Sequence, residues 1–290
     1  MDRIALYPCA KINWLLNITN VRPDGFHELD MLMQTIALHD ELILSKSDDI
    51  ALCSEGVFVE SGDNLVLKAI HALRRYTGKD ISVRAQLKKN IPARAGLGGG
   101  SSDCAFAIYG INELYGLGLS LSEMADIGFS LGSDVPFFFY GGLCRVRGRG
   151  ELIEKLTDAP ECSLVITHVG GGLSTKDVYA MYDKAGSKAR FASYETVAEC
   201  LYRQDYKALN INTFNDLQAP ASLLMPQIEK TIEILNDAGA SFSMMSGSGS
   251  AVYGVFKDKA AAERAAAAIP DSYLTRTSRQ SLCMPYDRQP

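Results

Sequence analysis

The segment of the sequence with the clearest chemical meaning is a glycine-rich loop in its first half. It covers residues 92–102 and reads PARAGLGGGSS, with three consecutive glycines before two serines. Glycines permit backbone torsions and close approaches that side chains forbid, so several N–H groups can converge on one anion. A helix predicted over residues 101–115 would add its positive N-terminal dipole. The loop therefore predicts a site for a di- or triphosphate rather than an ordinary surface turn.

The loop differs from the two best-known nucleotide-binding motifs. No Gly-Lys-Ser/Thr sequence follows it, as a P-loop requires, and it lacks the preceding strand and downstream acid of a Rossmann fingerprint. A different class of nucleotide-binding protein is therefore indicated. In that class, Ser101 or Ser102 could also offer a hydroxyl to magnesium.

Hydrophobic spacing predicts the elements that position this loop. Strands are expected over residues 10–18, 29–38, 41–44, 50–53, 81–87, 136–140 and 163–169, on both sides of 246–250, and near 273. Helices are expected over residues 64–76, 101–115, 122–131, 194–202 and 219–238, and after 174 and 258. The polar stretch 145–160 predicts a domain boundary, because a fresh alternating pattern follows it. We therefore expect an α+β protein with two domains, residues 1–155 and 156–290.

Composition argues against several classes of function. Among 290 residues, 29 Lys and Arg stand against 34 Asp and Glu without a dense basic run, so a nucleic-acid partner is not expected. The seven cysteines form no CxxC pair that would suggest zinc or a redox couple. No apolar stretch has the character of a signal peptide or the length of a membrane span. We expect a cytoplasmic protein with reduced thiols, either a monomer or a homodimer, that does not bind membranes.

Three segments, in this order along the chain, resemble the motifs of the GHMP kinase superfamily. They are PCAKIN at residues 8–13, the glycine-rich loop at 92–102, and MSGSGS at 245–250. The resemblance implies an enzyme that moves the γ-phosphate of ATP, with Mg²⁺, onto the hydroxyl of a small molecule. It also implies an N-terminal domain similar to domain 2 of ribosomal protein S5 and a ferredoxin-like C-terminal α/β sandwich, with a cleft between them.

Further segments resemble one branch of this superfamily along nearly the whole chain. They are RPDGFH at residues 22–27, LGSDVPF at 131–137 and NDL at 215–217. Members of that branch phosphorylate the 2-hydroxyl of 4-diphosphocytidyl-2-C-methyl-D-erythritol in the non-mevalonate isoprenoid pathway. The resemblance implies the same acceptor for this chain.

The resemblance also implies catalytic and nucleotide-binding roles for matching residues. Asp134 and Lys11 would form the catalytic pair in a direct, in-line transfer: Asp134 would position the alcohol and accept its proton, and Lys11 would be its electrostatic partner. Asn64 and Lys89 would lie beside the adenine of ATP. The loop residues that would hold the phosphates are Pro92, Ala93, Arg94, Ala95, Gly96, Leu97, Gly98, Gly99, Gly100, Ser101 and Ser102.

The implied acceptor site consists of aromatic and polar side chains. Phe26 and Tyr179 match positions where the family sandwiches the cytosine between two aromatic rings, and any base can stack in this way. His27 would read the edge of the cytosine. Asn13 and Thr175 would form hydrogen bonds to the acceptor.

Four positions depart from the pattern of this branch. Asp103 stands where Asn is usual, Phe26 where Tyr is usual, Met33 where an aromatic residue is frequent, and Gln218 where Glu is usual. A negative charge at residue 103 should repel the phosphates of ATP unless magnesium intervenes. No departure removes a catalytic group, but together they leave the identity of the acceptor open.

Two alternative functions therefore stay open at this point. The first is a GHMP kinase that acts on another small alcohol, similar to homoserine or mevalonate. The second is a catalytically silent regulator that binds a metabolite, and such a protein would be expected to have lost Lys11, Asp134 or the glycine loop. All three features are present in this sequence.

Overall fold

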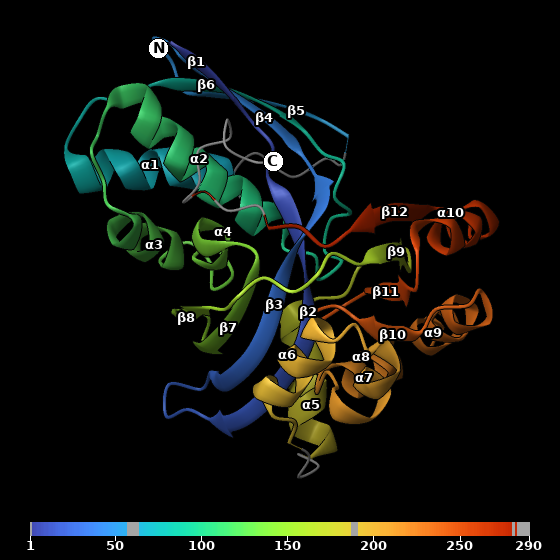
Figure 1. The fold of residues 1–290 in the computed structure, drawn as a ribbon. Helices are drawn as coiled ribbons and strands as arrows, with labels where there is room; N and C mark the ends of the chain where they lie inside the picture. The colour runs from blue at the N-terminus through green and yellow to red at the C-terminus, as the bar shows by residue number, and fades with distance from the viewer. Residues whose placement is uncertain (1, 57–63, 187–190, 280–281, 283–290) are drawn as a thin grey trace.

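The computed structural model describes residues 2–56, 64–186, 191–279 and 282. Within these residues the strands form three four-stranded sheets, and no helix combines the length and apolar character needed to cross a membrane. Figure 1 shows the long central strands β2 and β3 running between an upper layer, which contains the N-terminus, and the C-terminal sheet.

The first sheet lies in the upper layer and is backed by two helices that contact each other, α1 (Leu65–Thr77) and α2 (Gly99–Tyr115). Its strands, in order across the sheet, are β1 (Arg3–Leu6), β4 (Glu41–Lys46), β6 (Val83–Lys88) and β5 (Ala51–Glu55). Burial alternates along β6, because every second side chain points toward the helices. The Asn64 side chain caps α1 by accepting a hydrogen bond from the backbone N–H of Val66 at 2.9 Å.

The second sheet contains the long hairpin and forms a wall shared by two hydrophobic cores. Its strands, in order, are β2 (Cys9–Val21), β3 (His27–His39), β7 (Leu143–Gly148) and β8 (Leu152–Lys155). Ile12 and Trp14 face the core beneath the C-terminal sheet, whereas Met31 and Met33 belong to the core around α1 and α2. The hairpin is consequently buried on both faces over most of its length.

The third sheet belongs to the C-terminal part. Its strands, in order, are β10 (Phe242–Met245), β11 (Ala251–Phe256), β9 (Ser163–His168) and β12 (Ser272–Arg276), all antiparallel. The helices α9 (Gln227–Asp237) and α10 (Lys259–Ala268) pack against this sheet (Figure 1). The strand order and the two helices are those of a ferredoxin-like sandwich, as expected from the sequence.

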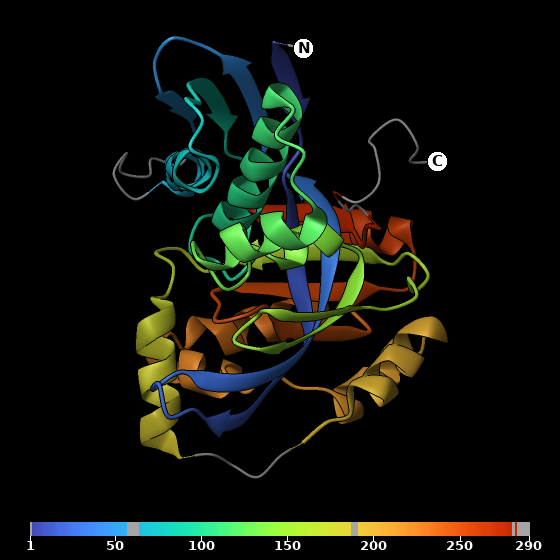
Figure 2. The same cartoon turned by 90° about the vertical axis from the view of Figure 1, so that its left-hand side faces the viewer.

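The remaining helices surround the lower end of the hairpin and the glycine loop. They are α3 (Leu121–Phe129), α4 (Phe137–Tyr140), α5 (Thr175–Ala185), α6 (Tyr194–Tyr202), α7 (Tyr206–Asn212) and α8 (Gln218–Leu224). In Figure 2, α5 stands upright to the left of the hairpin, below α2 and α3. The N-terminus of α5 therefore faces the region where α2 begins.

Two of the sequence predictions were wrong in detail. Residues 136–140 were expected to form a strand but contain α4, in which Phe137, Phe138 and Phe139 are all buried without the alternation of a strand. The single helix expected over residues 219–238 is two helices, α8 and α9, separated at Pro226, because the residue before a proline disfavours helical torsions. The polar stretch 145–160, where we predict the domain boundary, contains part of β7 and all of β8.

Candidate active site

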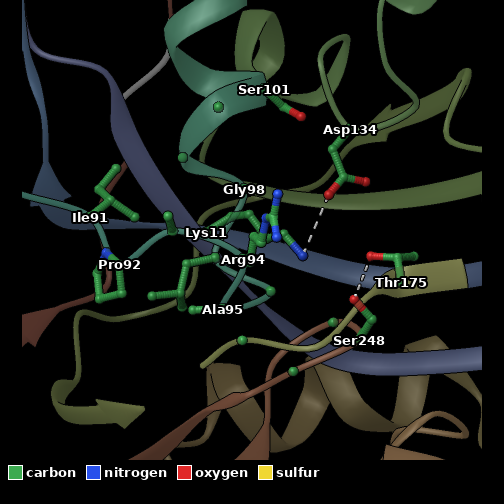
Figure 3. Close-up of a pocket in the computed structure, with 18 of the residues that line it drawn as sticks. Lys11, Ile91, Pro92, Arg94, Ala95, Gly98, Ser101, Asp134, Thr175 and Ser248 are labelled. Carbon is green, nitrogen blue, oxygen red and sulfur yellow. Dashed lines mark hydrogen bonds and ion pairs between the residues drawn. The ribbon is translucent and has the colours of Figure 1, made fainter. Parts of the chain in front are cut away.

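A cavity of about 1200 Å³ lies among β2, the glycine loop, the residues before α5, and the loop between β10 and β11. Figure 3 shows 18 of its lining residues. Most of the site residues predicted from the sequence line it: Lys11, Asn13, Asn64, Lys89, Pro92, Ala93, Arg94, Ala95, Gly96, Leu97, Gly98, Gly99, Gly100, Ser101, Asp134, Thr175 and Tyr179. Three predicted residues, Phe26, His27 and Ser102, do not contribute to its wall.

The glycine loop forms a cradle that side chains would fill. Gly98 is the N-cap of α2 with φ 71°, and the helix begins at Gly99, two residues earlier than predicted. A Cβ atom on Gly98 would lie 2.9 Å from the Phe138 ring and 3.0 Å from the Lys11 side chain. No side chain of the described residues caps this helix, so the N–H groups of its first turn face the cavity without such a partner. This arrangement fits a phosphate group.

The loop is held in place by the C-terminal glycine motif, although about 150 residues separate the two in sequence. The Ser246 hydroxyl donates to the carbonyl oxygen of Gly96 at 3.0 Å, and a Cβ atom on Gly96 would lie 2.1 Å from the Ser246 carbonyl oxygen. The Asn215 amide in turn donates to the carbonyl oxygens of Met245 and Gly247, at 3.0 and 2.7 Å. The NDL motif therefore fixes the loop that supports the cradle, a role that the sequence alone did not reveal.

Lys11 and Asp134 meet in the cavity, as the sequence predicted (Figure 3). The Lys11 ammonium lies 3.6 Å from Oδ2 of Asp134 and donates to Oδ1 of Asn13 at 2.7 Å. The backbone N–H of Lys11 donates to the carbonyl oxygen of Leu97 at 3.0 Å, which ties β2 to the glycine loop. The exposed fraction is 4% for the lysine side chain and 35% for the aspartate. The carboxylate is thus the member of the pair that a bound molecule can reach.

Burial lowers the pKa of Lys11, and the nearby carboxylate of Asp134 partly opposes this effect. The lysine is therefore a partly desolvated cation with a neighbour of opposite charge. Such an ammonium interacts more strongly with nearby negative charge than one in bulk water, because little solvent screens it.

Lys89 belongs to a buried charge cluster that sequence reasoning missed. Its ammonium pairs with the Asp40 carboxylate and lies 2.7 Å from Oδ2 of Asp103. The carboxylate of Asp40 also accepts from the backbone N–H groups of Asn90 and Ile91, at 2.6 and 2.8 Å. Burial by itself lowers the pKa of Lys89, but the two carboxylates outweigh it and raise that pKa above its ordinary value. The charge at residue 103 is thus directed at Lys89.

The predicted acceptor residues are only partly brought together. Tyr179 lines the cavity, and its ring stacks on the buried imidazole of His27 with centroids 4.7 Å apart. Nε2 of His27 lies 2.8 Å from Oδ1 of Asp183. The Phe26 ring is half exposed and lies outside the cavity wall, with the guanidinium carbon of Arg149 3.7 Å from its centroid. The predicted stacking partner therefore has one face occupied by an arginine that the sequence analysis did not single out.

The remaining polar groups bear on nucleotide and metal binding. The Thr175 hydroxyl forms a 2.9 Å hydrogen bond with the Ser248 hydroxyl at the cavity (Figure 3). The Ser102 hydroxyl is buried and lacks a hydrogen-bond partner among the described residues, whereas Ser101 lines the cavity. Within the described part of the chain, no group of three His, Cys, Asp or Glu side chains could hold a metal ion by itself.

Comparisons with known proteins identify the family. The GHMP kinases N terminal domain matches residues 64–142, and the GHMP kinases C terminal domain matches residues 197–274. A 4-diphosphocytidyl-2-C-methyl-D-erythritol kinase of Thermodesulfovibrio yellowstonii is 39% identical over 259 residues, which cover 88% of this chain and 90% of the relative. The chain belongs to the 4-diphosphocytidyl-2-C-methyl-D-erythritol kinase family of GHMP kinases.

Other relatives agree with this membership. A kinase of the same name from Pelotomaculum thermopropionicum is 36% identical over 261 residues, 89% of this chain and 91% of the relative. A crystal structure of 4-(cytidine 5'-diphospho)-2C-methyl-D-erythritol kinase superposes with a TM-score of 0.81 at 29% identity, covering 95% of this chain and 99% of the other. A homoserine kinase from Cytophaga hutchinsonii shares the fold alone, with a TM-score of 0.69 at 21% identity, over 97% of this chain and 96% of that one.

Family membership confirms several predictions made from the sequence. The protein has the two-domain GHMP kinase fold of the α+β class. It is a small-molecule kinase, and the kinases of this family use ATP. The cavity at the glycine loop is accordingly its candidate active site.

Proposed function

We propose that this kinase phosphorylates the 2-hydroxyl of 4-diphosphocytidyl-2-C-methyl-D-erythritol with ATP, in the non-mevalonate route to isoprenoids. The observation that carries the proposal is the Lys11–Asp134 pair, 3.6 Å apart, at the mouth of the glycine cradle. The Tyr179 ring lines the same cavity and offers a surface on which a pyrimidine can stack. One cavity thus has groups suited to phosphoryl transfer and a ring suited to binding the cytosine of the acceptor.

In the mechanism that we propose, Asp134 orients the acceptor alcohol and takes its proton as the new bond forms. The acceptor oxygen bonds to the γ-phosphorus while the bond from that phosphorus to the bridging oxygen of ADP breaks, in one in-line step. Lys11 pairs with this carboxylate and stabilises the negative charge of the moving phosphoryl group. No phosphorylated enzyme forms, so trapping a labelled protein from labelled ATP would contradict this mechanism.

We propose that the backbone of residues 92–102 binds the phosphates, with Asn64 and Lys89 near the adenine. A bound magnesium ion would neutralise phosphate charge. The described residues include no cluster that could hold it alone, which fits an ion held mainly by the nucleotide. Of the two serines suggested from the sequence, Ser101 has a hydroxyl on the cavity wall and is a better candidate to assist than Ser102.

For the acceptor, we propose that the cytosine stacks between Tyr179 and Phe26, with His27 at its edge. Asn13 and Thr175, both on the cavity wall, would form hydrogen bonds to the rest of the molecule. The Phe26 ring has half of its surface exposed, so one face is available for stacking while Arg149 covers the other. This part of the proposal distinguishes a cytidylyl substrate from homoserine or mevalonate, which have no base to stack.

ADP release by the purified protein with magnesium and ATP tests the proposal. The cytidine diphosphate methylerythritol substrate is compared with homoserine, mevalonate and galactose, and Asp134→Asn is the control. We expect turnover of the cytidylyl substrate alone and its loss in Asp134→Asn, with nucleotide binding retained. Turnover of another alcohol alone would refute the acceptor, and silence on all four would favour a metabolite-binding regulator.

We also propose that the domains span residues 1–155 and 156–290, since β8 ends at Lys155. No disulfide joins any of the six described cysteines, which supports our proposal that the enzyme works in the reducing cytoplasm. We also propose that the protein is a monomer or a homodimer. Limited proteolysis between β8 and β9 and sedimentation analysis would check the boundary and the oligomeric state.

A further inference from the structure

Arg94 adopts a backbone conformation that favours glycine, in the middle of the phosphate loop. Its φ is 53°, and among the described residues other than glycine only Gln204 and Asp271 also have positive φ. Arg94 is the one of these three that lines the cavity. A glycine would adopt the same torsions without strain, so the backbone gives no reason for an arginine. The reason must lie in its side chain.

The Arg94 side chain extends from the loop into the cavity, on the side where Lys11 and Asp134 lie (Figure 3). Within the described residues its guanidinium makes no hydrogen bond or ion pair. The backbone of Gly172 lies close to the base of the side chain, since a Cβ atom added to Gly172 would lie 2.8 Å from the Arg94 Cβ. The head group is therefore free to bind a ligand.

The charges of the cavity single out this guanidinium. The charged side chains on its wall, within the described residues, are those of Lys11, Lys89, Arg94, Asp103 and Asp134. Lys11 faces Asp134, and Lys89 faces both Asp103 and the buried Asp40 behind it. Arg94 is thus the wall's one cation without a carboxylate partner among the described residues. A triphosphate brings several negative charges into this cavity, and a planar guanidinium can bind two phosphate oxygens at once.

We propose that the Arg94 guanidinium binds the γ-phosphate of ATP and stays on it during transfer. The proposal rests on the ATP-dependent reaction but not on which alcohol is the acceptor. Lys11 would act mainly on the carboxylate that holds the alcohol, whereas Arg94 would stabilise the equatorial oxygens of the phosphoryl group. The backbone cradle would hold the phosphates nearer to the nucleoside.

Binding of ADP and of a nonhydrolysable ATP analogue, both with magnesium and measured by calorimetry, tests this role. Arg94→Gly removes the guanidinium at a position whose torsions suit glycine, so the fold should be kept. Asp271→Gly is a matched control, since Asp271 also has φ 53° and lies outside the cavity. Arg94→Lys keeps the charge but not the forked geometry.

We expect Arg94→Gly to weaken binding of the ATP analogue by about tenfold or more, the value of one charge-assisted contact, and to change ADP binding little. Arg94→Lys should fall between this variant and the wild type, and Asp271→Gly should match the wild type. Turnover by Arg94→Gly should decrease by about a hundredfold and recover partly with added methylguanidinium.

Equal losses for ADP and the analogue, or no loss for either, would overturn the proposal. So would intact discrimination between the two nucleotides together with a raised KM for the acceptor, because the guanidinium would then bind the diphosphate of the acceptor. If the wild type fails to turn over the cytidylyl substrate, the proposed function fails. The nucleotide-binding comparison still decides the role of Arg94.

Discussion

The buried cluster of Asp40, Lys89 and Asp103 leads to a quantitative prediction about stability and pH. One ammonium faces two carboxylates in it, so the fully ionised cluster has an excess negative charge. Burial raises the pKa of Asp103 from 3.8 to about 7; Lys89 opposes this rise, and the carboxylate of Asp40 adds to it. Between these two values, the folded protein retains a proton at Asp103 that the unfolded chain has released.

The free energy of unfolding should therefore decrease as the pH rises through this window, because the folded state binds more protons than the unfolded state. Each pKa unit corresponds to about 1.4 kcal/mol. Between about pH 5 and the raised pKa of Asp103, about 7, lie about two pH units over which only the folded state keeps the proton. The free energy of unfolding should therefore decrease by about 3 kcal/mol from about pH 5 to about pH 8. Asp103→Asn keeps the shape of the side chain and removes the titration.

Urea denaturation of the wild type and Asp103→Asn at about pH 5 and about pH 8 measures the effect. From about pH 5 to about pH 8, the free energy of unfolding of the wild type should decrease by about 3 kcal/mol more than that of Asp103→Asn, because all other titrating groups are common to both proteins. Asp80→Asn is the control, because the Asp80 side chain is 84% exposed, and its free energy of unfolding should change with pH as that of the wild type does. If the wild type and Asp103→Asn lose stability equally, the cluster does not hold a proton and the reasoning is refuted.

Two further changes test the glycine cradle and the proposed catalytic role of Lys11. Gly96→Ala should lower the free energy of unfolding by about 2 kcal/mol or more in urea, since its φ is 77° and its Cβ would meet a carbonyl oxygen at 2.1 Å. Gly116→Ala, at a φ of 56° with nothing within 4 Å, should cost only about 1 kcal/mol. Lys11→Met should abolish ADP release but change stability by no more than about 1 kcal/mol, because an apolar side chain avoids the desolvation of the buried cation. A stability loss several times larger would show that the ion pair supports the fold.

The parts that the sequence predicted well are those with short-range causes. The glycine loop and the start of α2 follow from the backbone freedom of glycine over a few residues. The start of α3 has an equally local cause, because the Ser120 hydroxyl accepts the backbone N–H of Glu123 in a capping box. Such features need no knowledge of the rest of the fold, so a local pattern is enough to find them.

The parts that could not be predicted depend on pairs distant in sequence. Asp40 reaches Lys89 only because β4 lies beside β6, and Glu41 pairs with Lys88 in that register. No spacing in the sequence links residues 49 positions apart. The contact between Phe26 and Arg149 has the same kind of cause, because Arg149 comes from the turn between β7 and β8, far from Phe26 in sequence.

The burial of β2 on both faces explains why Lys11, the proposed catalytic lysine, can remain a poorly solvated cation in a fixed position. On one side, its backbone N–H is bound by the carbonyl oxygen of Leu97 in the glycine loop. On the other, the hydroxyl of Tyr253 donates to the carbonyl oxygen of Asn13 at 2.9 Å, and the hydroxyl of Thr213 donates to that of Trp14. Lys11 thus cannot move away from Asp134 without breaking contacts to both halves of the chain. The stability of both domains therefore offsets the free energy that is lost by burying the lysine. As a result, the Lys11 ammonium is already oriented before ATP or the acceptor binds.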